Sequence, residues 1–182
     1  MSKNIDTEER QRIKRILSGR SDEYAYFVKT YSGQVLDFVN RMVCDASDAE
    51  ELAQDAFVRA FRSLGQFDGR SSWLTWVLRI AFHTTLSHLK RQRPQWLSIE
   101  DLPLADTTDE EFNTGREERI RLLETSIDTL PPNEQMLLHL YYYDDRPLRD
   151  IAYIMDTEPG VLATRLHRIR KKLLQMMKEN ER

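Results

Sequence analysis

The sequence predicts an all-α protein made of two small helical domains that a flexible linker joins. Apolar residues recur at steps of three and four along most of the chain, and no segment alternates convincingly as a strand would. This periodicity stops between Pro94 and about Gly115, where Asp, Thr and Glu are frequent and Pro103 interrupts the chain. A length of 182 residues allows two small domains. We therefore expect domains at residues 1–93 and 117–182 and an acidic linker at residues 94–116.

The first domain is predicted to consist of helices at about residues 8–17, 21–43, 48–64 and 71–91. Ser21 and Asp22 are placed to cap the second of these helices, and Ser47 or Asp48 to cap the third. Pro94 ends the fourth, because a proline ring clashes with the preceding helical turn. The third helix has a predicted inner stripe of Ala49, Leu52, Ala53, Ala56, Phe57, Ala60, Phe61 and Leu64.

In the second domain, helices are expected at about residues 117–129, 133–142 and 148–155, and from residue 159 onward. The last two have short apolar faces, formed by Leu148, Ile151, Ala152 and Met155 and by Leu162, Leu166, Ile169 and Leu173. A tight turn between two such helices predicts a helix-turn-helix, whose second helix enters the DNA major groove. The outward residues of that second helix are the candidate DNA contacts Ala163, Thr164, Arg165, His167, Arg168 and Lys171. The alternative is an ordinary helical hairpin with a solvated basic face.

Charge is distributed unevenly along the chain. The net charge is −3, but residues 94–119 hold eight acidic and only two basic side chains. Residues 69–99 and 161–178 contain basic side chains and no acidic ones. Phosphates respond to local charge, since salt screens distant charge, so these two stretches are candidates for nucleic-acid contact.

The first acid-free stretch combines a glycine-containing loop, two tryptophans and several basic residues. Aromatic faces can stack on unpaired bases, cationic groups can follow a separated strand, and a small polar loop can hold a flipped base. The candidates for this role are Gly69, Arg70, Ser71, Ser72, Trp73, Trp76, Arg79, His83, Lys90 and Arg91. Taken singly, each aromatic residue is more often part of a core.

A third group lies on the outer side of the predicted helix at 48–64 and consists of Glu51, Gln54, Asp55, Val58 and Arg59. Taken alone, such a group is ordinarily a solvated charged face.

Several function classes are disfavoured. The single cysteine, Cys44, excludes an internal disulfide and fits a reducing cytosol, and we expect it to be a small buried residue near a helix end. No Cys/His cluster has metal-ligand spacing, and no nucleophile–base pair or glycine-rich phosphate loop emerges, so we expect no metal, cofactor or catalysis. No apolar run approaches the roughly 20 residues of a membrane span, and the polar N-terminus is unlike a signal peptide. A cytoplasmic location is expected.

Together and in this order, the segments between about residues 20 and 178 resemble the small two-domain sigma factors of the extracytoplasmic-function group. The run from Asp48 to Arg62 is similar to the family's helix that binds the β′ clamp helices of RNA polymerase. The runs Gly69-Arg70-Ser71-Ser72-Trp73 and Thr75 to Ala81 resemble its promoter-melting segment. Leu130-Pro131-Pro132 through Leu173 resembles its carboxyl-terminal promoter-reading domain.

This resemblance implies a transcription initiation factor that binds core RNA polymerase through the β and β′ subunits. The group at 51–59 would bind polymerase, the group at 69–91 would melt and read the minus-ten element, and the group at 163–171 would read the minus-thirty-five element. It also implies control by an anti-sigma factor, no small-molecule substrate, a protein that is not itself a membrane protein, and a linker that passes through polymerase channels. His83 stands where the family often has Asn, and Asp156-Thr157-Glu158-Pro159 replaces a more apolar turn.

An alternative from another class is an autonomous helix-turn-helix regulator whose first domain binds a signal or dimerises. Such a protein would bind a symmetric duplex site without polymerase. An enzyme has little support in the sequence.

Overall fold

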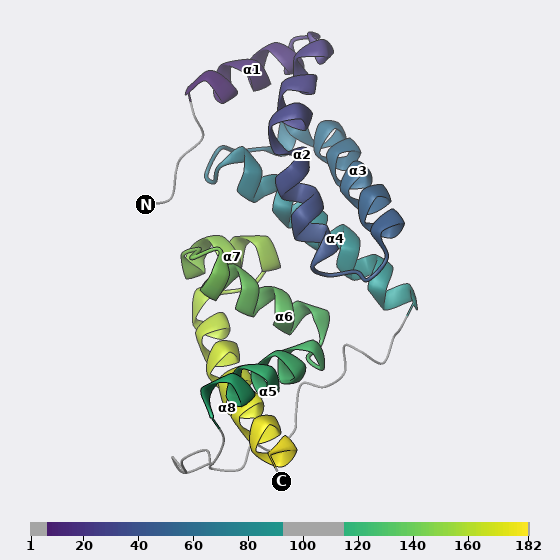
Figure 1. Cartoon of the computed structure of the whole chain (residues 1–182). Coiled ribbons are helices and arrows are strands. Elements are labelled where there is room, and N and C mark those ends of the chain that lie inside the picture. The colour runs from purple at the N-terminus through teal and green to yellow at the C-terminus, as the bar shows by residue number, and fades with distance from the viewer. Residues whose placement is uncertain (1–6, 93–114, 182) are drawn as a thin grey trace.

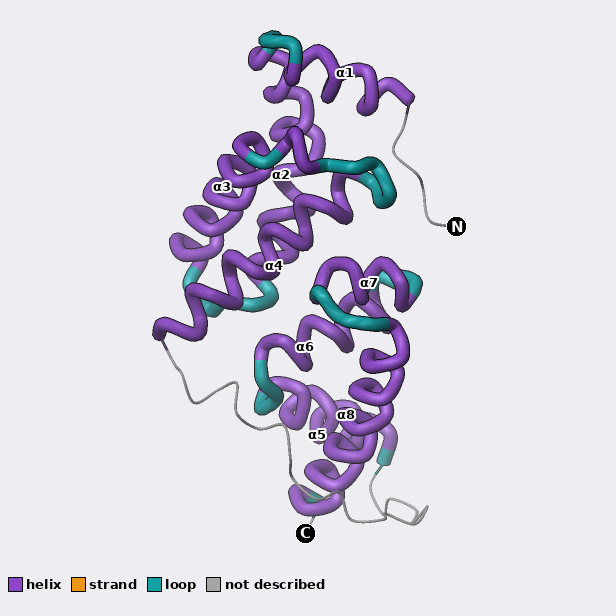
Figure 2. Tube along the Cα trace, turned by 180° about the vertical axis from the view of Figure 1, so that it is seen from behind, coloured by secondary structure: helices purple, strands orange, loops and turns teal. Residues whose placement is uncertain are grey.

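The computed structural model describes residues 7–92 and 115–181, and every regular element in these two ranges is helical (Figures 1 and 2). The predicted all-α class is thereby confirmed. Most of the predicted linker lies outside the described residues, and its last predicted position, Arg116, already belongs to a helix.

The N-terminal unit contains four α-helices: α1 (Thr7–Leu17), α2 (Tyr24–Asn40), α3 (Ala46–Arg62) and α4 (Trp73–Gln92). Short 3-10 turns at Ser21–Glu23 and Leu64–Gln66 lie before α2 and after α3. The cap predicted for α3 was wrong by a few residues. Asp45 is the N-cap, and its carboxylate accepts hydrogen bonds from the backbone N–H groups of Ser47 at 2.8 Å and Asp48 at 3.0 Å.

The C-terminal unit contains α5 (Arg116–Asp128), α6 (Pro132–Leu138), α7 (Leu148–Met155) and α8 (Pro159–Asn180), and a π-helical turn at His139–Tyr143 extends α6. Asp156 ends α7 in the left-handed conformation, with φ of 54°. Pro159 then starts α8, where its missing N–H costs no hydrogen bond. The tight turn between α7 and α8 gives the pair the order and spacing expected of a helix-turn-helix.

An aromatic cluster around Trp73 holds α2, α3 and α4 together. The indole of Trp73 is fully buried, and its ring centroid lies 4.5 Å from Phe27, 5.3 Å from Tyr31 and 6.0 Å from Phe57. Stacked aromatic pairs at these distances stabilise a core beyond the area that they bury. The packing of Trp73 therefore holds the N-terminal end of α4 against α2 and α3.

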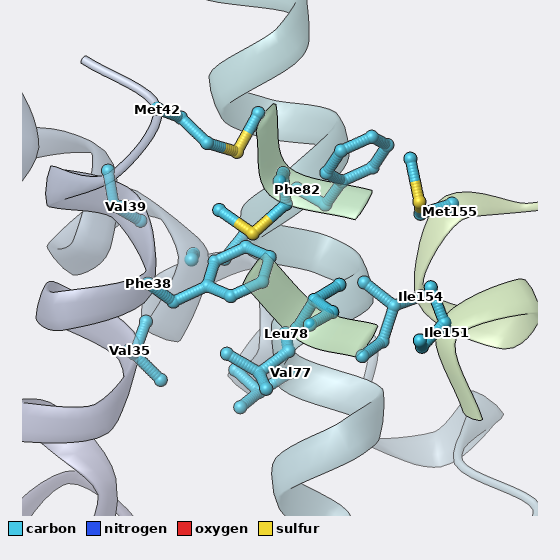
Figure 3. Packing of buried hydrophobic residues seen from close by; sticks show 14 of the residues in the cluster. Val35, Phe38, Val39, Met42, Val77, Leu78, Phe82, Ile151, Ile154 and Met155 are labelled. Carbon is cyan, nitrogen blue, oxygen red and sulfur yellow. The ribbon is translucent and has the colours of Figure 1, made fainter. Parts of the chain in front are cut away.

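The two units also share apolar packing. Figure 3 shows Leu78 and Phe82 of α4 between Phe38 of α2 on one side and Ile154 and Met155 of α7 on the other. All five side chains are buried, with Ile154 at 0% exposure. The helix α4 is consequently covered from both units, which explains why buried residues occur all around it.

Two expectations about burial were wrong. Phe61, predicted in the inner stripe of α3, is 41% exposed, although its ring forms a T-shaped pair with that of Tyr24 at a centroid distance of 4.9 Å. Cys44, expected to be buried, is exposed in the turn between α2 and α3. In the described ranges no helix is both long and apolar enough to cross a bilayer.

Candidate functional site

The outer face of α3 carries the predicted polymerase contacts. Glu51, Gln54, Val58 and Arg59 are exposed, and Asp55 is half-buried and paired with Arg59 at 2.8 Å. The inner face of the same helix is buried at Ala49, Ala56 and Ala60. Val58, a predicted contact, is 45% exposed, and Phe61, which was predicted to be buried, is 41% exposed, so Phe61 adds to the apolar part of the outer face.

A groove of about 580 Å³ between α3 and α4 brings two predicted groups together. Glu51, Asp55 and Arg59 line it from α3, and Arg79, His83 and Arg91 line it from α4. At one end His88 of α4 lies 3.3 Å from the carboxylate of Asp48. The predicted polymerase face and the basic side of α4 therefore adjoin along one groove, with Glu51, Asp55 and the basic Arg59 on the α3 wall and basic groups on the α4 wall.

The loop before α4 is held by its own polar side chains. Gly69 has φ of 73°, which glycine adopts without steric cost. The carboxylate of Asp68 accepts a hydrogen bond from the Arg70 N–H at 3.0 Å. Ser72 caps α4, since its Oγ accepts from the Thr75 N–H at 3.1 Å. Ser71 is buried, whereas the side chain of Arg70 is 86% exposed.

The two tryptophans of this segment are core residues in this conformation. Trp73 is 0% exposed and Trp76 is 7% exposed, with the Trp76 ring 5.1 Å from that of Phe67. A buried indole cannot stack on a base, so direct base contact by Trp73 or Trp76 does not fit this arrangement. The guanidinium of Arg70 is exposed, and its Nε lies 3.1 Å from the carboxylate of Asp68, which is exposed too.

Arg79, a predicted phosphate contact, is engaged by the other unit. Its Nη1 donates to the backbone carbonyl of Tyr153 at 2.6 Å, and its Nη2 pairs with Asp156 Oδ1 at 2.6 Å. Burial lowers the pKa of His83, one turn further along α4, and the nearby charge of Arg79 lowers it further. A depressed pKa keeps that imidazole neutral near pH 7. Lys90 and Arg91 are exposed at the end of α4.

The helix α8 presents the predicted minus-thirty-five contacts. Its inner residues Leu162, Leu166 and Ile169 are buried, which turns the intervening positions outward. On the outward side Ala163, Thr164, His167 and Arg168 are exposed, and Arg165 and Lys171 are half-buried. The Thr164 hydroxyl donates to the Gly160 carbonyl at 3.1 Å. The structure brings all of these candidates to one face.

Sequence reasoning missed the second covered face of α7. Tyr153 and Ile154 lie off the predicted apolar face of this helix, yet Ile154 is fully buried and Tyr153 is half-buried. A signal was present, because two large apolar residues stood next to the predicted stripe of an eight-residue helix. Such an excess indicates a helix that is covered on more than one side.

Known families match both units. The sequence profile of Sigma-70 region 2 matches residues 27–95, and that of Sigma-70 region 4 matches residues 120–173. Together these matches cover more than half of the chain.

Three sigma factors are similar to this chain over most of its length. SigW, an ECF RNA polymerase sigma factor of Bacillus subtilis, is 26% identical over 93% of this chain and 97% of its own length. The RNA polymerase sigma-H factor of Pseudomonas aeruginosa is 29% identical over 90% of this chain and 91% of its own. The ECF sigma-E factor of Escherichia coli is 28% identical, with 87% and 88% covered.

Solved structures share the fold. CnrH, in complex with the cytosolic domain of CnrY, superposes with a TM-score of 0.62 at 17% identity, over 93% of this chain and 97% of CnrH. The sigma factor RpoE of Bartonella quintana, in complex with the anti-sigma factor NepR, gives a TM-score of 0.57 at 16% identity, over 86% and 97%.

Proposed function

Because the chain belongs to the extracytoplasmic-function group of the sigma-70 family, we propose a specific division of labour among its helices. The outer face of α3 binds core RNA polymerase through Glu51, Gln54, Asp55, Val58 and Arg59. The α4 segment, with Arg70, Arg79, His83, Lys90 and Arg91, contacts the melted minus-ten element. The outer face of α8 reads the minus-thirty-five element.

The observation on which this proposal rests most is the exposure of one side of α8. Its inner side is buried against its own unit, while Thr164, His167 and Arg168 are exposed on the outer side. A helix with one buried side and one basic, acid-free side at the second position of a helix-turn-helix can enter a major groove without rearrangement. Guanidinium and hydroxyl groups then reach base edges and phosphates.

For the α4 segment, the burial of the tryptophans changes the proposed chemistry. Trp73 and Trp76 shape the loop from inside the core, and the loop itself, from Gly69 to Ser72, takes the unstacked base. We include these two residues as supports for the loop rather than as stacking platforms. Separating base pairs costs a few kcal/mol per step, and the net charge of −3 gives the free chain little attraction to DNA, so polymerase must contribute to melting.

The proposal also covers the boundaries of the two units, the cellular location of the protein and its control by a partner. The promoter-melting unit comprises residues 1–93 and the promoter-reading unit residues 117–182, with the acidic segment 94–116 between them. A partner of core polymerase works in the cytoplasm. CnrH was solved in complex with the cytosolic domain of CnrY, and RpoE of Bartonella quintana in complex with the anti-sigma factor NepR. We therefore propose that an anti-sigma factor covers the polymerase and DNA faces of this chain too.

Core polymerase binding tests the α3 assignment. The triple substitution Glu51→Ala, Gln54→Ala and Asp55→Ala should weaken binding of the full chain to core polymerase at least tenfold, measured by fluorescence anisotropy of the chain labelled at Cys44. A matched control, Glu118→Ala with Glu124→Ala, removes the same charge from exposed positions of α5 and should leave binding unchanged. Unchanged core binding by the triple variant would refute the assignment of α3.

A further inference from the structure

The buried side of α1 contains a carboxyl group. Glu9, Ile13 and Ile16 follow one another at steps of four and three residues along this helix, and all three are buried. The two isoleucines are ordinary core residues. A glutamate at such a position loses its hydration on folding, which costs free energy unless another group hydrogen-bonds to it. Apolar packing alone therefore does not explain Glu9.

Tyr31 of α2 supplies the hydrogen bond. Its hydroxyl donates to Oε1 of Glu9. The Tyr31 ring in turn stacks on the indole of Trp73, with the ring centroids 5.3 Å apart and the planes inclined by 28°. Trp73 is fully buried and is the first residue of α4. These three residues form one continuous series of contacts from α1 to the start of α4, which we call the Glu9–Tyr31–Trp73 relay.

The relay ends at the loop to which the proposed function assigns the unstacked base. Ser72, directly before Trp73, caps α4, since its Oγ accepts a hydrogen bond from the Thr75 N–H at 3.1 Å. The direction in which the loop leaves the helix therefore depends on where the Trp73 side chain packs. Because protein interiors are close-packed, a shift of the Tyr31 ring also moves the indole that it stacks on.

The other end of α1 lies close to the chain that enters the loop. The Leu17 side chain reaches the 3-10 turn at Leu64–Gln66, where a β-carbon on Gly65 would lie 3.9 Å from Leu17 Cδ2. Gly65 precedes Gly69 of the loop by only four residues. Figure 2 shows this loop at the end of the N-terminal unit that α1 covers. The helix α1 thus acts on the loop from both of its ends.

Contacts that do not involve Glu9 attach α1 to the start of α2. Arg12 and Arg15 donate to the same carboxylate oxygen of Glu23, at 3.2 Å and 2.7 Å. The Arg12 guanidinium also lies 4.1 Å from the centre of the Tyr26 ring, in a cation–π contact. These contacts hold α1 in place by themselves, so the hydrogen bond of Glu9 is not needed to attach the helix.

We propose that Glu9 is a positioning residue for promoter melting, which sets the geometry of the Gly69–Ser72 loop through Tyr31 and Trp73. This inference rests on the proposed function and extends it to α1, which lies before residue 27, where the match to Sigma-70 region 2 begins. Replacing both partners of a buried hydrogen bond by apolar groups of similar shape is nearly neutral for stability. Variants of the relay should therefore keep the fold and alter the loop.

Fluorine NMR of the full chain tests the relay directly. The chain contains three tryptophans, and after labelling with 5-fluorotryptophan the Trp73 resonance is assigned by comparison with Trp76→Phe and Trp96→Phe. Glu9→Leu should shift this resonance, because the Tyr31 ring loses the hydrogen bond that orients it. A Trp73 resonance that stays at its wild-type position in Glu9→Leu would overturn the proposal.

Three further variants separate positioning from general damage. Glu9→Gln keeps a side-chain carbonyl that accepts from Tyr31 and should restore the wild-type Trp73 resonance. Glu8→Leu makes the same substitution at an exposed position of α1 and should leave the resonance unchanged. Tyr31→Phe retains the stacked ring without the hydroxyl and should shift the resonance, which keeps the test decisive if Glu9→Leu fails to fold.

The kinetics of promoter opening provide the functional readout. The reconstituted holoenzyme is tested on a promoter fragment that the wild-type holoenzyme enriches from genomic DNA, and closed-complex affinity is separated from the opening rate. Glu9→Leu and Tyr31→Phe should each slow opening about fivefold, the effect of one ordinary hydrogen bond, with unchanged closed-complex affinity. The double variant should be no slower than either single one, because both remove the same hydrogen bond. Wild-type opening by Glu9→Leu, or slow opening by Glu9→Gln, would contradict the proposal.

Core binding distinguishes this inference from the function on which it rests. All of these variants should bind core polymerase as the wild type does, because the outer face of α3 is unchanged. Weaker core binding by Glu9→Leu would show that α1 acts on polymerase instead of the loop. If the wild-type holoenzyme opens no fragment at all, the proposed function fails. If it opens the fragment and Glu9→Leu opens it equally fast, only the positioning role fails.

Discussion

The helices α4 and α8 look alike in sequence and differ in the structure. Both belong to acid-free, basic stretches, and both were predicted to contact DNA. The helix α8 keeps an exposed outer side, with Thr164, His167 and Arg168 open to a partner. The helix α4 is buried around most of its circumference, and Arg79 is occupied by α7. A basic stretch of sequence thus identifies side chains that could bind phosphate, and the packing around them determines which of those side chains are accessible in this structure.

The largest expected effect concerns the buried start of α4. Trp73→Ala should lower the free energy of unfolding by about 3–5 kcal/mol, because it empties the centre of an aromatic cluster. Urea denaturation followed by circular dichroism measures this change. The control Tyr143→Ala, at a residue that is 74% exposed, should change the stability by less than about 0.5 kcal/mol. A stable Trp73→Ala protein that lost only DNA binding would restore the original assignment of Trp73 as a base contact.

On α8, a substitution on the open side should affect DNA and leave stability unchanged. Arg168→Ala should reduce transcription by the reconstituted holoenzyme about tenfold, since a side-chain contact to a base or phosphate contributes about 1–3 kcal/mol. The template is a promoter fragment that the wild-type holoenzyme enriches from genomic DNA. Arg116→Ala, at an exposed position of α5, is the matched control. A drop in the thermal midpoint of Arg168→Ala would show that this residue supports the fold instead.

Arg79→Ala should have a smaller effect than Arg168→Ala on the same template. The substitution removes a proposed phosphate contact, but that side chain is already engaged by the Tyr153 carbonyl and the Asp156 carboxylate, which would compete with DNA for it. That competition reduces the net contribution of the contact, so we expect a loss of roughly threefold or less. A loss equal to that of Arg168→Ala would mean that the contacts of Arg79 with Tyr153 and Asp156 do not compete with DNA, and the contrast between the two helices would disappear.

The smallest expected effect is a dependence on pH. Burial, followed by the charge of Arg41, lowers the pKa of His139 below its usual value, and burial lowers that of His83 as well. The unfolded chain therefore binds more protons than the folded chain as pH falls below about 6.5, so stability present at neutral pH decreases on acidification. The urea midpoint should fall between pH 7.5 and 5.5. His139→Gln should flatten part of this slope, and an unchanged slope would exclude His139 as a contributor.

The parts of the fold that depend on local pattern could be predicted from the sequence. The inner stripe of α8 at Leu162, Leu166 and Ile169 is buried as its spacing indicated. The starts of α6 and α8 followed the prolines at 132 and 159. The prediction for α2 was wrong at both ends: Ser21 and Asp22 form a 3-10 turn instead of capping the helix, which runs from Tyr24 to Asn40. The cap of α3 was misplaced because Asp45, Ser47 and Asp48 are all good capping residues, and only the backbone geometry distinguishes Asp45 among them.

The arrangement of the two units could not be predicted in this way. Arg79 and Tyr153 are 74 residues apart, and no periodicity connects positions at that separation. The burial of Trp73 likewise depends on Phe27, Tyr31 and Phe57 from other helices. For the candidate site, the sequence identified which side chains could contact DNA, but it could not identify which of them the protein itself already occupies.

The contacts of Arg79 with Tyr153 and Asp156 have a quantitative consequence for any anion that this side chain binds. If Arg79 is released from both partners in only a fraction of the molecules, the apparent dissociation constant of that anion equals the intrinsic one divided by the fraction. A substitution in the turn after α7 can therefore change the affinity of α4 for an anion without altering any residue of α4.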